Sequence, residues 1–122
     1  MRKLTSFSDP ADLGRVTLEE ASSLLAASNQ RSVAVFEHGT LQVKLYAPRG
    51  HDVQTPHARD EIYVVARGNG WFVNEGRRHP IGPHDVLFAR AGAVHRFEAF
   101  SDDFLVWVFF YGPEGGEADA GR

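Results

Sequence analysis

The residues whose type and spacing point most directly to chemistry are His57 and Glu61. They lie four residues apart in a segment that reads as extended, and side chains at even spacing point to the same face of a strand. An ionised glutamate on the inward face of a strand is costly unless it is paired or coordinates a cation. The spacing therefore predicts a metal site in which an imidazole and a carboxylate face the interior.

The same spacing leaves two structural interpretations open. In the first, Glu61 forms an ion pair with a neighbouring arginine, Arg59 or Arg67. In the second, a bend at Pro56 turns the side chain of His57 out to solvent, because proline interrupts the hydrogen bonding of a strand. The spacing alone does not choose between these interpretations and the metal site.

Two segments of the chain resemble the sequence motifs of the cupin family, in particular those of small single-domain bacterial cupins. Residues 50–68 contain a glycine, then His57 and Glu61, then a glycine that closes the motif. Residues 84–95 end with a glycine and, three residues later, His95, as in the second motif. The resemblance implies a jelly-roll barrel, the double-stranded β-helix, in which His57, Glu61 and His95 hold one divalent metal ion.

The first motif departs from the family pattern at Thr55, which takes the place of its first histidine, and threonine is a poor neutral ligand. This leaves the fourth metal ligand open. His51 shares the parity of His57 but lies six residues away, so the chain would need to curve back. Gln54 could present its amide oxygen if Pro56 disturbs the pleat. We expect three protein ligands with water completing the shell, and we place Gln54 ahead of His51 as a fourth.

The resemblance implies a metal-dependent protein but does not choose its activity. Two histidines and one glutamate suit Fe(II) and also Mn, Co, Ni and Zn. Open positions on such a metal bind substrate or activate water or dioxygen. One expectation is therefore dioxygenase-like or isomerase-like chemistry on a small organic metabolite. The other is non-catalytic binding of a metal or metabolite, because one barrel serves both classes. Arg59, Arg67 and Arg90 could contact a carboxylate of the small-molecule ligand.

The composition of the 122-residue chain excludes several other classes of function. It has no cysteine, which excludes disulfides, thiolate metal sites and cysteine nucleophiles. The net charge is −3 and the basic residues are scattered, so we expect neither a nucleic acid nor a membrane as partner. Since the first residues lack a long apolar stretch, we expect a cytoplasmic protein. Small barrels with apolar strands often pair, so we expect a homodimer through the N-terminal strands and helix.

One helix is expected before the barrel, over residues 17–29. Thr17 is a suitable N-cap, and Glu20 completes a capping box. Beyond the helix the apolar residues recur with a period of two, and short strands between Gly, Pro and Asn turns predict an all-β fold. The expected division is an arm and helix over 1–31, a barrel over 32–113 and a flexible tail over 114–122.

Three segments carry specific expectations about the barrel. Residues 104–111 are apolar at successive positions, which suits a strand buried on both faces. Residues 68–70, Gly-Asn-Gly, read as a hairpin turn that ends a strand at 62–65. Residues 79–84 read as a surface loop between the two motifs. Aromatic residues at alternate strand positions, such as Tyr63, belong most simply to the core.

Overall fold

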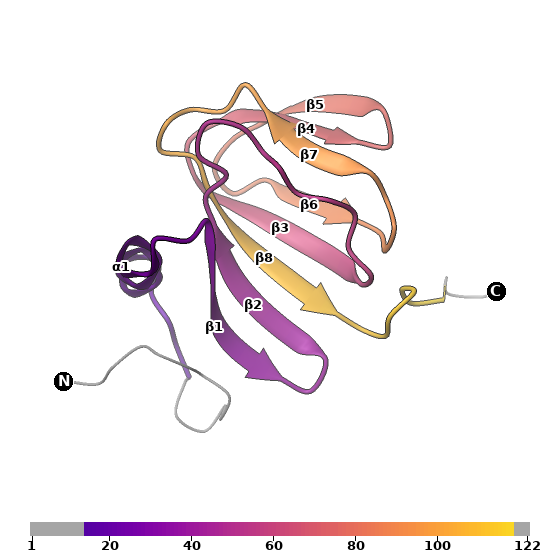
Figure 1. The fold of residues 1–122 in the computed structure, drawn as a ribbon, viewed down its shortest axis with the longest axis horizontal. Helices are drawn as coiled ribbons and strands as arrows, with labels where there is room; N and C mark the ends of the chain where they lie inside the picture. The colour runs from indigo at the N-terminus through magenta and orange to yellow at the C-terminus, as the bar shows by residue number, and fades with distance from the viewer. Residues whose placement is uncertain (1–13, 119–122) are drawn as a thin grey trace.

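The computed structural model describes residues 14–118, which form one helix and eight strands. The strands make two antiparallel sheets that enclose the interior of a barrel (Figure 1). The prediction of an all-β fold with one short N-terminal helix is confirmed. Residues 1–13 of the predicted arm and 119–122 of the predicted tail lie outside the described residues. No helix of the described residues is long and apolar enough to cross a membrane.

The helix and strands follow one another in chain order with short connections. Their bounds are α1 Leu18–Ser28, β1 Ser32–His38, β2 Leu41–Tyr46, β3 Asp60–Arg67, β4 Gly70–Asn74, β5 Arg77–Ile81, β6 Val86–Ala89, β7 His95–Glu98 and β8 Leu105–Tyr111.

Strand β8 is the centre of the larger sheet. This sheet has five strands in the order β1-β2-β8-β3-β6, and the smaller sheet has three in the order β5-β4-β7. Trp107 and Phe109 of β8 pack against an outer apolar cluster, whereas Val106 and Val108 belong to an inner one. The prediction of a strand buried on both faces is therefore confirmed.

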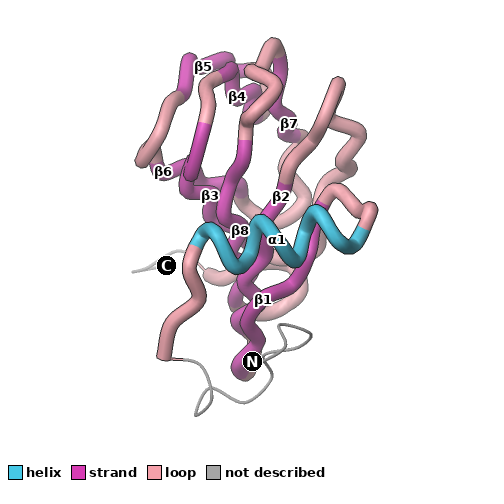
Figure 2. Tube along the Cα trace, turned by 90° about the vertical axis from the view of Figure 1, so that its left-hand side faces the viewer, coloured by secondary structure: helices cyan, strands magenta, loops and turns pink. Residues whose placement is uncertain are grey.

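Helix α1 begins where its capping sequence predicts. The Thr17 hydroxyl accepts a hydrogen bond from the backbone N–H of Glu20, and the Glu20 carboxylate accepts one from the backbone N–H of Thr17. Ala21 and Leu25 are buried in the outer cluster, together with side chains of β1 and β2. Figure 2 shows α1 lying across β1 and β2. The helix therefore covers the outer face of these two strands and leaves their other face to the interior.

Pairing across the larger sheet determines which side chains face the interior. Lys44 of β2 lies opposite Val108 of β8, which in turn lies opposite Tyr63 of β3. In the neighbouring row, Phe110 of β8 lies opposite Glu61 of β3. Because alternate residues of a strand share a face, both rows point to the side of the sheet away from α1.

The prediction of a hairpin turn at residues 68–70 is wrong, because β3 and β4 belong to different sheets and do not pair. The segment instead carries the chain from one sheet to the other, close to the loop before β8. Gly68 has a φ of +80°, and a Cβ on it would lie 2.4 Å from Ser101 Oγ and 2.8 Å from Phe104 Cα. Glycine is needed here for close approach of two backbone segments.

The prediction of a surface loop at residues 79–84 is wrong for its first part. His79 and Pro80 belong to β5, an exposed edge strand of the smaller sheet that pairs with β4. An edge strand tolerates proline and polar side chains, because one side of it forms no ladder. The strand therefore lacks the apolar alternation by which the other strands can be recognised.

The chain after β8 stays attached to the barrel. The N–H of Gly115 donates to the carbonyl oxygen of Ala58 at 2.7 Å, and the N–H of Glu117 donates to Asp60 Oδ2 at 2.9 Å. The structure thus differs from the expected flexible tail over residues 114–117. The difference arises because the buried Asp60 carboxylate offers an acceptor that the composition of the tail does not reveal.

Candidate metal centre

Three elements bring His57, Glu61 and His95 together in the barrel. Glu61 lies on β3, His95 is the first residue of β7, and His57 lies in the loop before β3. The Nε2 atom of His95 is 2.6 Å from Glu61 Oε1, and the Nε2 atom of His57 is 3.8 Å from the same oxygen. One potential ligand atom of each residue lies within 4.8 Å of the other two. The two sheets and the loop thus supply one side chain each.

His57 reaches the site from a bent loop and not from the extended strand that its spacing suggested. Residues 58–59 form a bend just before β3 begins. The carbonyl oxygen of His57 accepts a hydrogen bond of 2.8 Å from the N–H of Gly92, which fixes the loop against the turn before β7. The imidazole packs edge-on against Phe110, with ring centroids 5.0 Å apart. The side chain is 34% exposed and faces Glu61, so the bend does not turn it out to solvent.

The Glu61 carboxylate is buried without the hydrogen bonds that a buried charge needs. Its side chain is 1% exposed, and neither oxygen accepts a well-formed hydrogen bond from the described residues. In the described part of the chain its ion-pair contacts are the two imidazoles, and the alternative pairing with Arg59 or Arg67 is not formed. A carboxylate in this position is costly unless a cation or a proton neutralises it.

The hydrogen bonding of His95 leaves one ring nitrogen for a metal. Its Nδ1 lies 2.8 Å from the carbonyl oxygen of Ala93, which can only accept, so Nδ1 carries the proton. In the neutral imidazole Nε2 then holds a lone pair, which is the form that binds metals. This nitrogen faces Glu61 Oε1 at 2.6 Å. Two electron-rich atoms this close require a proton or a metal ion between them.

The pKa values of the two imidazoles shift in opposite directions. Burial has the largest influence on His57 and lowers its pKa; the Glu61 charge opposes this, and the charges of His95 and Lys44 add to it. Burial also acts to lower the pKa of His95, but the adjacent Glu61 carboxylate and the hydrogen bond to the Ala93 carbonyl outweigh that effect, so its pKa is raised. His57 is therefore ready to bind a metal at neutral pH, whereas a metal at His95 must displace a proton more often.

Gln54 places its amide oxygen beside His57. This oxygen is 3.2 Å from His57 Nε2 and accepts a hydrogen bond of 3.0 Å from the hydroxyl of Tyr63. The amide nitrogen donates to Asp52 Oδ2 at 2.6 Å. Since a carboxylate only accepts hydrogen bonds, Asp52 determines which end of the amide faces the site. Gln54 is thus oriented to offer an oxygen as a ligand.

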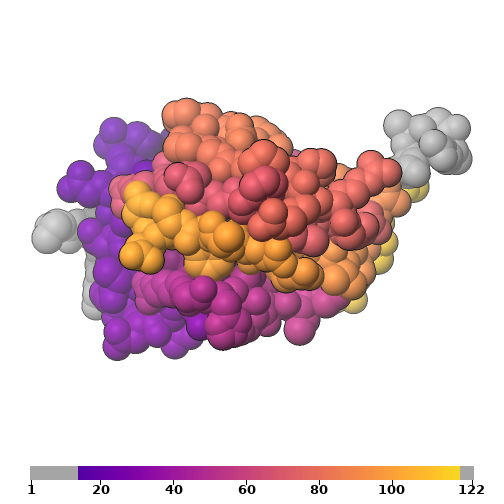
Figure 3. Space-filling view, turned by 90° about the horizontal axis from the view of Figure 1, so that it is seen from above, coloured from indigo at the N-terminus to yellow at the C-terminus, as the bar shows by residue number. Residues whose placement is uncertain are grey.

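Asp52 also ties the loop before β3 to its neighbours. Its carboxylate accepts hydrogen bonds from the N–H of Phe97, at 2.8 Å, and from the hydroxyl of Tyr46. Figure 3 shows this loop, in magenta, lying along β7, in orange. Burial, and then the hydrogen bond to Asp52, raise the pKa of Tyr46, so its hydroxyl remains a donor. The sequence analysis missed Asp52, although it shares the parity of Gln54 and is the carboxylate nearest to it in sequence.

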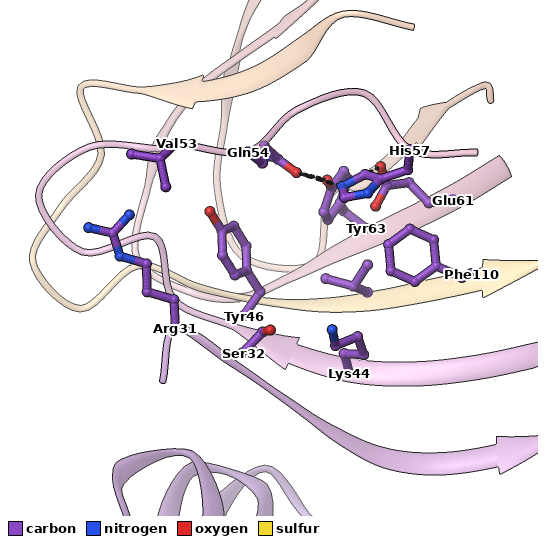
Figure 4. A pocket seen from close by; sticks show the side chains of 11 residues that line it. Arg31, Ser32, Lys44, Tyr46, Val53, Gln54, His57, Glu61, Tyr63 and Phe110 are labelled. Atoms are coloured by element: carbon purple, nitrogen blue, oxygen red, sulfur yellow. Dashed lines mark hydrogen bonds and ion pairs between the residues drawn. The ribbon is translucent and has the colours of Figure 1, made fainter. Parts of the chain in front are cut away.

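A cavity of about 260 Å³ adjoins the candidate metal site (Figure 4). Its wall combines apolar side chains, hydroxyl groups, two cations and three of the residues predicted for the metal site. The lining residues are Arg31, Ser32, Lys44, Tyr46, Val53, Gln54, His57, Glu61, Tyr63, Val108 and Phe110. The arrangement provides a partly open space for a small molecule next to a group of potential metal ligands.

The other predicted residues lie away from this cluster. His51 and Thr55 are exposed, and neither lines the cavity, so the structure does not bring them to the site. None of the three arginines expected near a ligand carboxylate, Arg59, Arg67 and Arg90, lines it either. The aromatic Tyr63 is buried as expected, but its hydroxyl also belongs to the site, 3.1 Å from His95 Nε2.

The cations of the cavity are Arg31 and Lys44, which the sequence analysis did not select. The sequence contains a pattern that indicates an interior position for Lys44. Leu41, Val43 and Leu45 alternate along β2, and the amphipathic helix needs an apolar face to cover. If the helix covers that apolar face, the residues between them face the interior, and Lys44 is one of these.

The donor atoms fit a divalent metal ion. Neighbouring ligands about 2.1 Å from an octahedrally coordinated metal lie about 3 Å apart. The separations here are 2.6 Å for His95–Glu61, 3.2 Å for His57–Gln54 and 3.8 Å for His57–Glu61. Imidazole nitrogens with carboxylate or amide oxygens suit Fe, Mn, Co, Ni or Zn. The three residues predicted as ligands therefore form a candidate metal site.

Comparison with known proteins identifies relatives of the whole barrel. The cupin domain family matches residues 42–111. An uncharacterized protein of Streptomyces coelicolor is 30% identical over 99 residues, which cover 80% of this chain and 94% of that protein.

Solved structures are similar in fold at lower identity. A cupin-2 domain containing protein from Shewanella frigidimarina is 18% identical, with a TM-score of 0.61 over 75% of this chain and 91% of that one. KdgF from Halomonas sp. is 21% identical, with a TM-score of 0.59 over 89% of this chain and 96% of that one. The strand order, the clustered His, Glu and His side chains and these matches agree: the chain belongs to the cupin family.

Proposed function

We propose that the protein binds one divalent metal ion through His57, Glu61 and His95, with Gln54 as a fourth protein ligand. We propose further that a small organic molecule binds in the adjoining cavity. The observation that carries the proposal is the buried Glu61 carboxylate, which has no well-formed hydrogen bond among the described residues and faces both imidazoles. A metal ion satisfies all of these groups at once.

The residues around the ligands would support chemistry on a bound metabolite. When bound, a divalent metal supplies Lewis acidity toward an oxygen of the metabolite. Val108 and Phe110 line the cavity and exclude water from its wall. The pKa of Tyr63 is raised, by burial first and by the Glu61 charge next, so its hydroxyl keeps its proton and donates it to Gln54 in a hydrogen bond. Dioxygenase-like or isomerase-like reactions are compatible with this arrangement.

A non-catalytic metal- or metabolite-binding role is the second candidate, and one observation favours it. Among the described residues that line the cavity, His57 is the one histidine, and it is proposed as a metal ligand, so the wall offers no further imidazole for proton transfer. Tyr46 and Tyr63 have raised pKa values, and the remaining charged groups are Lys44, Arg31 and Glu61. Turnover of a metabolite panel by protein supplied with Fe(II) or Mn(II) separates the enzyme from the binding protein.

The metal site is tested by the melting temperature of metal-depleted protein on addition of each candidate metal. A ligand at about one hundred times its dissociation constant stabilises the native state by about 2.7 kcal/mol. We expect at least one metal to raise the melting temperature of the wild type, and Glu61→Gln to lose most of this shift. Glu37→Gln, at an exposed position on β1, is the matched control and should keep it. An equal shift in both variants would contradict the proposal.

The homodimer and the cytoplasmic location stay predictions. Light scattering at micromolar concentration tests the first, and a species of 13.5 kDa alone would contradict it.

A further inference from the structure

Lys44 is placed opposite the candidate metal site by the pairing of the sheet. It shares a transverse row with Val108 and Tyr63, and Tyr63 contacts both Gln54 and His95 through its hydroxyl. Strand β8 separates β2 from β3, so the backbones of Lys44 and Tyr63 are about 10 Å apart. Figure 4 shows Lys44 beside the cavity, on the side facing Glu61 and His57.

The ammonium group of Lys44 forms no direct ion pair with a carboxylate of the described residues. Its side chain is half-buried in the barrel wall, and the ion pairs of the described residues do not include it. A lysine that lines a cavity without a carboxylate partner is available to an anionic ligand, which can form a charge-assisted hydrogen bond with it. Arg31 lines the same cavity, and its Nη1 donates a long hydrogen bond of 3.4 Å to the carbonyl oxygen of His51.

The charges around the cavity favour an anion once a metal is bound. The carboxylates of Glu61 and Asp52 offset the charges of Lys44 and Arg31, so a divalent metal leaves the site with excess positive charge. The cavity of about 260 Å³ limits the ligand to a small molecule. Charged groups in such a space bind carboxylates through short, charge-assisted hydrogen bonds.

We propose that the cavity binds a small organic acid, with one carboxylate on Lys44 and a second oxygen donor directed at the metal site. This inference rests on the proposed metal-binding function and adds the ligand class and the residue that selects it. Lys44, Glu61 and His57 line the same cavity, so one small molecule can contact both the ammonium group and the metal site. Arg31, directly before β1, adds positive charge at the other side of Tyr46 (Figure 4).

The test is calorimetric titration of metal-loaded protein with malonate, succinate and glutarate, beside the neutral diamides of the same lengths. Metal content is measured before and after each titration. We expect at least one dicarboxylate to bind about tenfold more tightly than its diamide, because a charge-assisted hydrogen bond is lost in the amide. Lys44→Met preserves side-chain length and should weaken dicarboxylate binding by about tenfold or more at unchanged metal content.

Arg67→Met is the matched control, since it removes one positive charge from an exposed position outside the cavity. It should leave the dissociation constant within about twofold, as expected for a distant surface charge. Equal affinity for acid and diamide, no binding of any dicarboxylate, or an unchanged dissociation constant in Lys44→Met would overturn the inference. If the metal content measured before the titration shows that the wild type takes up no metal, the proposed function fails and this inference fails with it.

Discussion

The side-chain amide nitrogen of Gln54 donates a hydrogen bond of 2.6 Å to Asp52 Oδ2, and the amide oxygen therefore faces His57. Residues outside a metal site commonly set the orientation of its ligands in this way. Here the orienting residue, Asp52, and the proposed ligand, Gln54, lie two residues apart in one loop. The loop itself is held to β7 by the hydrogen bond from the N–H of Phe97 to Asp52.

We predict that Asp52→Asn weakens metal binding by about tenfold to one hundredfold, the usual cost of losing such an orienting group. An asparagine can donate as well as accept, so it no longer forces the Gln54 oxygen toward His57. The measurement is competitive titration of the metal against a chelator of known affinity. Asp102→Asn, at an exposed position in the loop before β8, is the control and should bind as the wild type does. Equal affinities in all three proteins would contradict the prediction.

Replacement of Gln54 by leucine should remove one protein oxygen from the metal. We predict a changed visible absorption spectrum of the cobalt-loaded Gln54→Leu protein, because the spectrum depends on the number and type of ligands. Thr55→Val is the matched control, since Thr55 is exposed and outside the cavity, and its spectrum should equal that of the wild type. A spectrum of Gln54→Leu that matches the wild type would show that Gln54 is not a ligand.

Metal binding should become tighter as the pH rises. The raised pKa of His95 contributes stability to the metal-free protein that is fully present below the ordinary value of 6.5 and lost as the pH rises through the raised value. A metal ion must displace that proton, so its binding is weakest at low pH. We predict that the increase in melting temperature on adding a saturating metal grows from about pH 5.5 to about pH 8. An increase that is the same throughout this range would contradict the prediction.

Gly68→Ala should destabilise the barrel by about 1–3 kcal/mol, the range for a strained backbone conformation. The added Cβ would approach Ser101 and Phe104 to less than 3 Å, at a φ of +80°. Gly39→Ala is the matched control, because Gly39 also has a positive φ, of +58°, but its Cβ would meet no atom within 4 Å. The free energy of unfolding in urea should fall more for Gly68→Ala than for Gly39→Ala. Equal losses would show that the close approach of the two loops carries no cost.

Most of the fold follows from local patterns in the sequence. The capping box at Thr17 and Glu20 uses only neighbouring residues, and so the helix was predicted with nearly its observed bounds. The apolar run of β8 predicted a strand buried on both faces, because only the middle of a covered sheet buries successive residues. Strand β5 and the passage at Gly68 depend on pairing with distant segments, which local patterns do not contain.

The candidate site, like the fold, was predicted only in part from local patterns. His57, Glu61 and His95 were selected by motif spacing, and the structure brings them together. His57 reaches the site for a reason other than the predicted one. A loop fixed by Gly92 positions its side chain, whereas the spacing predicted the alternation of a strand. The roles of Lys44 and Asp52 depend on which face of β2 the helix covers and on how the loop lies against β7. These are tertiary relationships that residue spacing does not specify.

The central claim is a metal ion held by two histidines and a glutamate, and its most direct test is elemental analysis. The protein is purified without chelator or affinity-column metal, beside the double variant His57→Ala, His95→Ala. A second double variant, His38→Ala, His79→Ala, removes two exposed histidines as a matched control. We predict about one metal ion per chain in the wild type and in the control, and none in His57→Ala, His95→Ala. Absence of metal from the wild type after addition of Fe, Mn, Co, Ni and Zn, or equal metal in all three proteins, would contradict the claim.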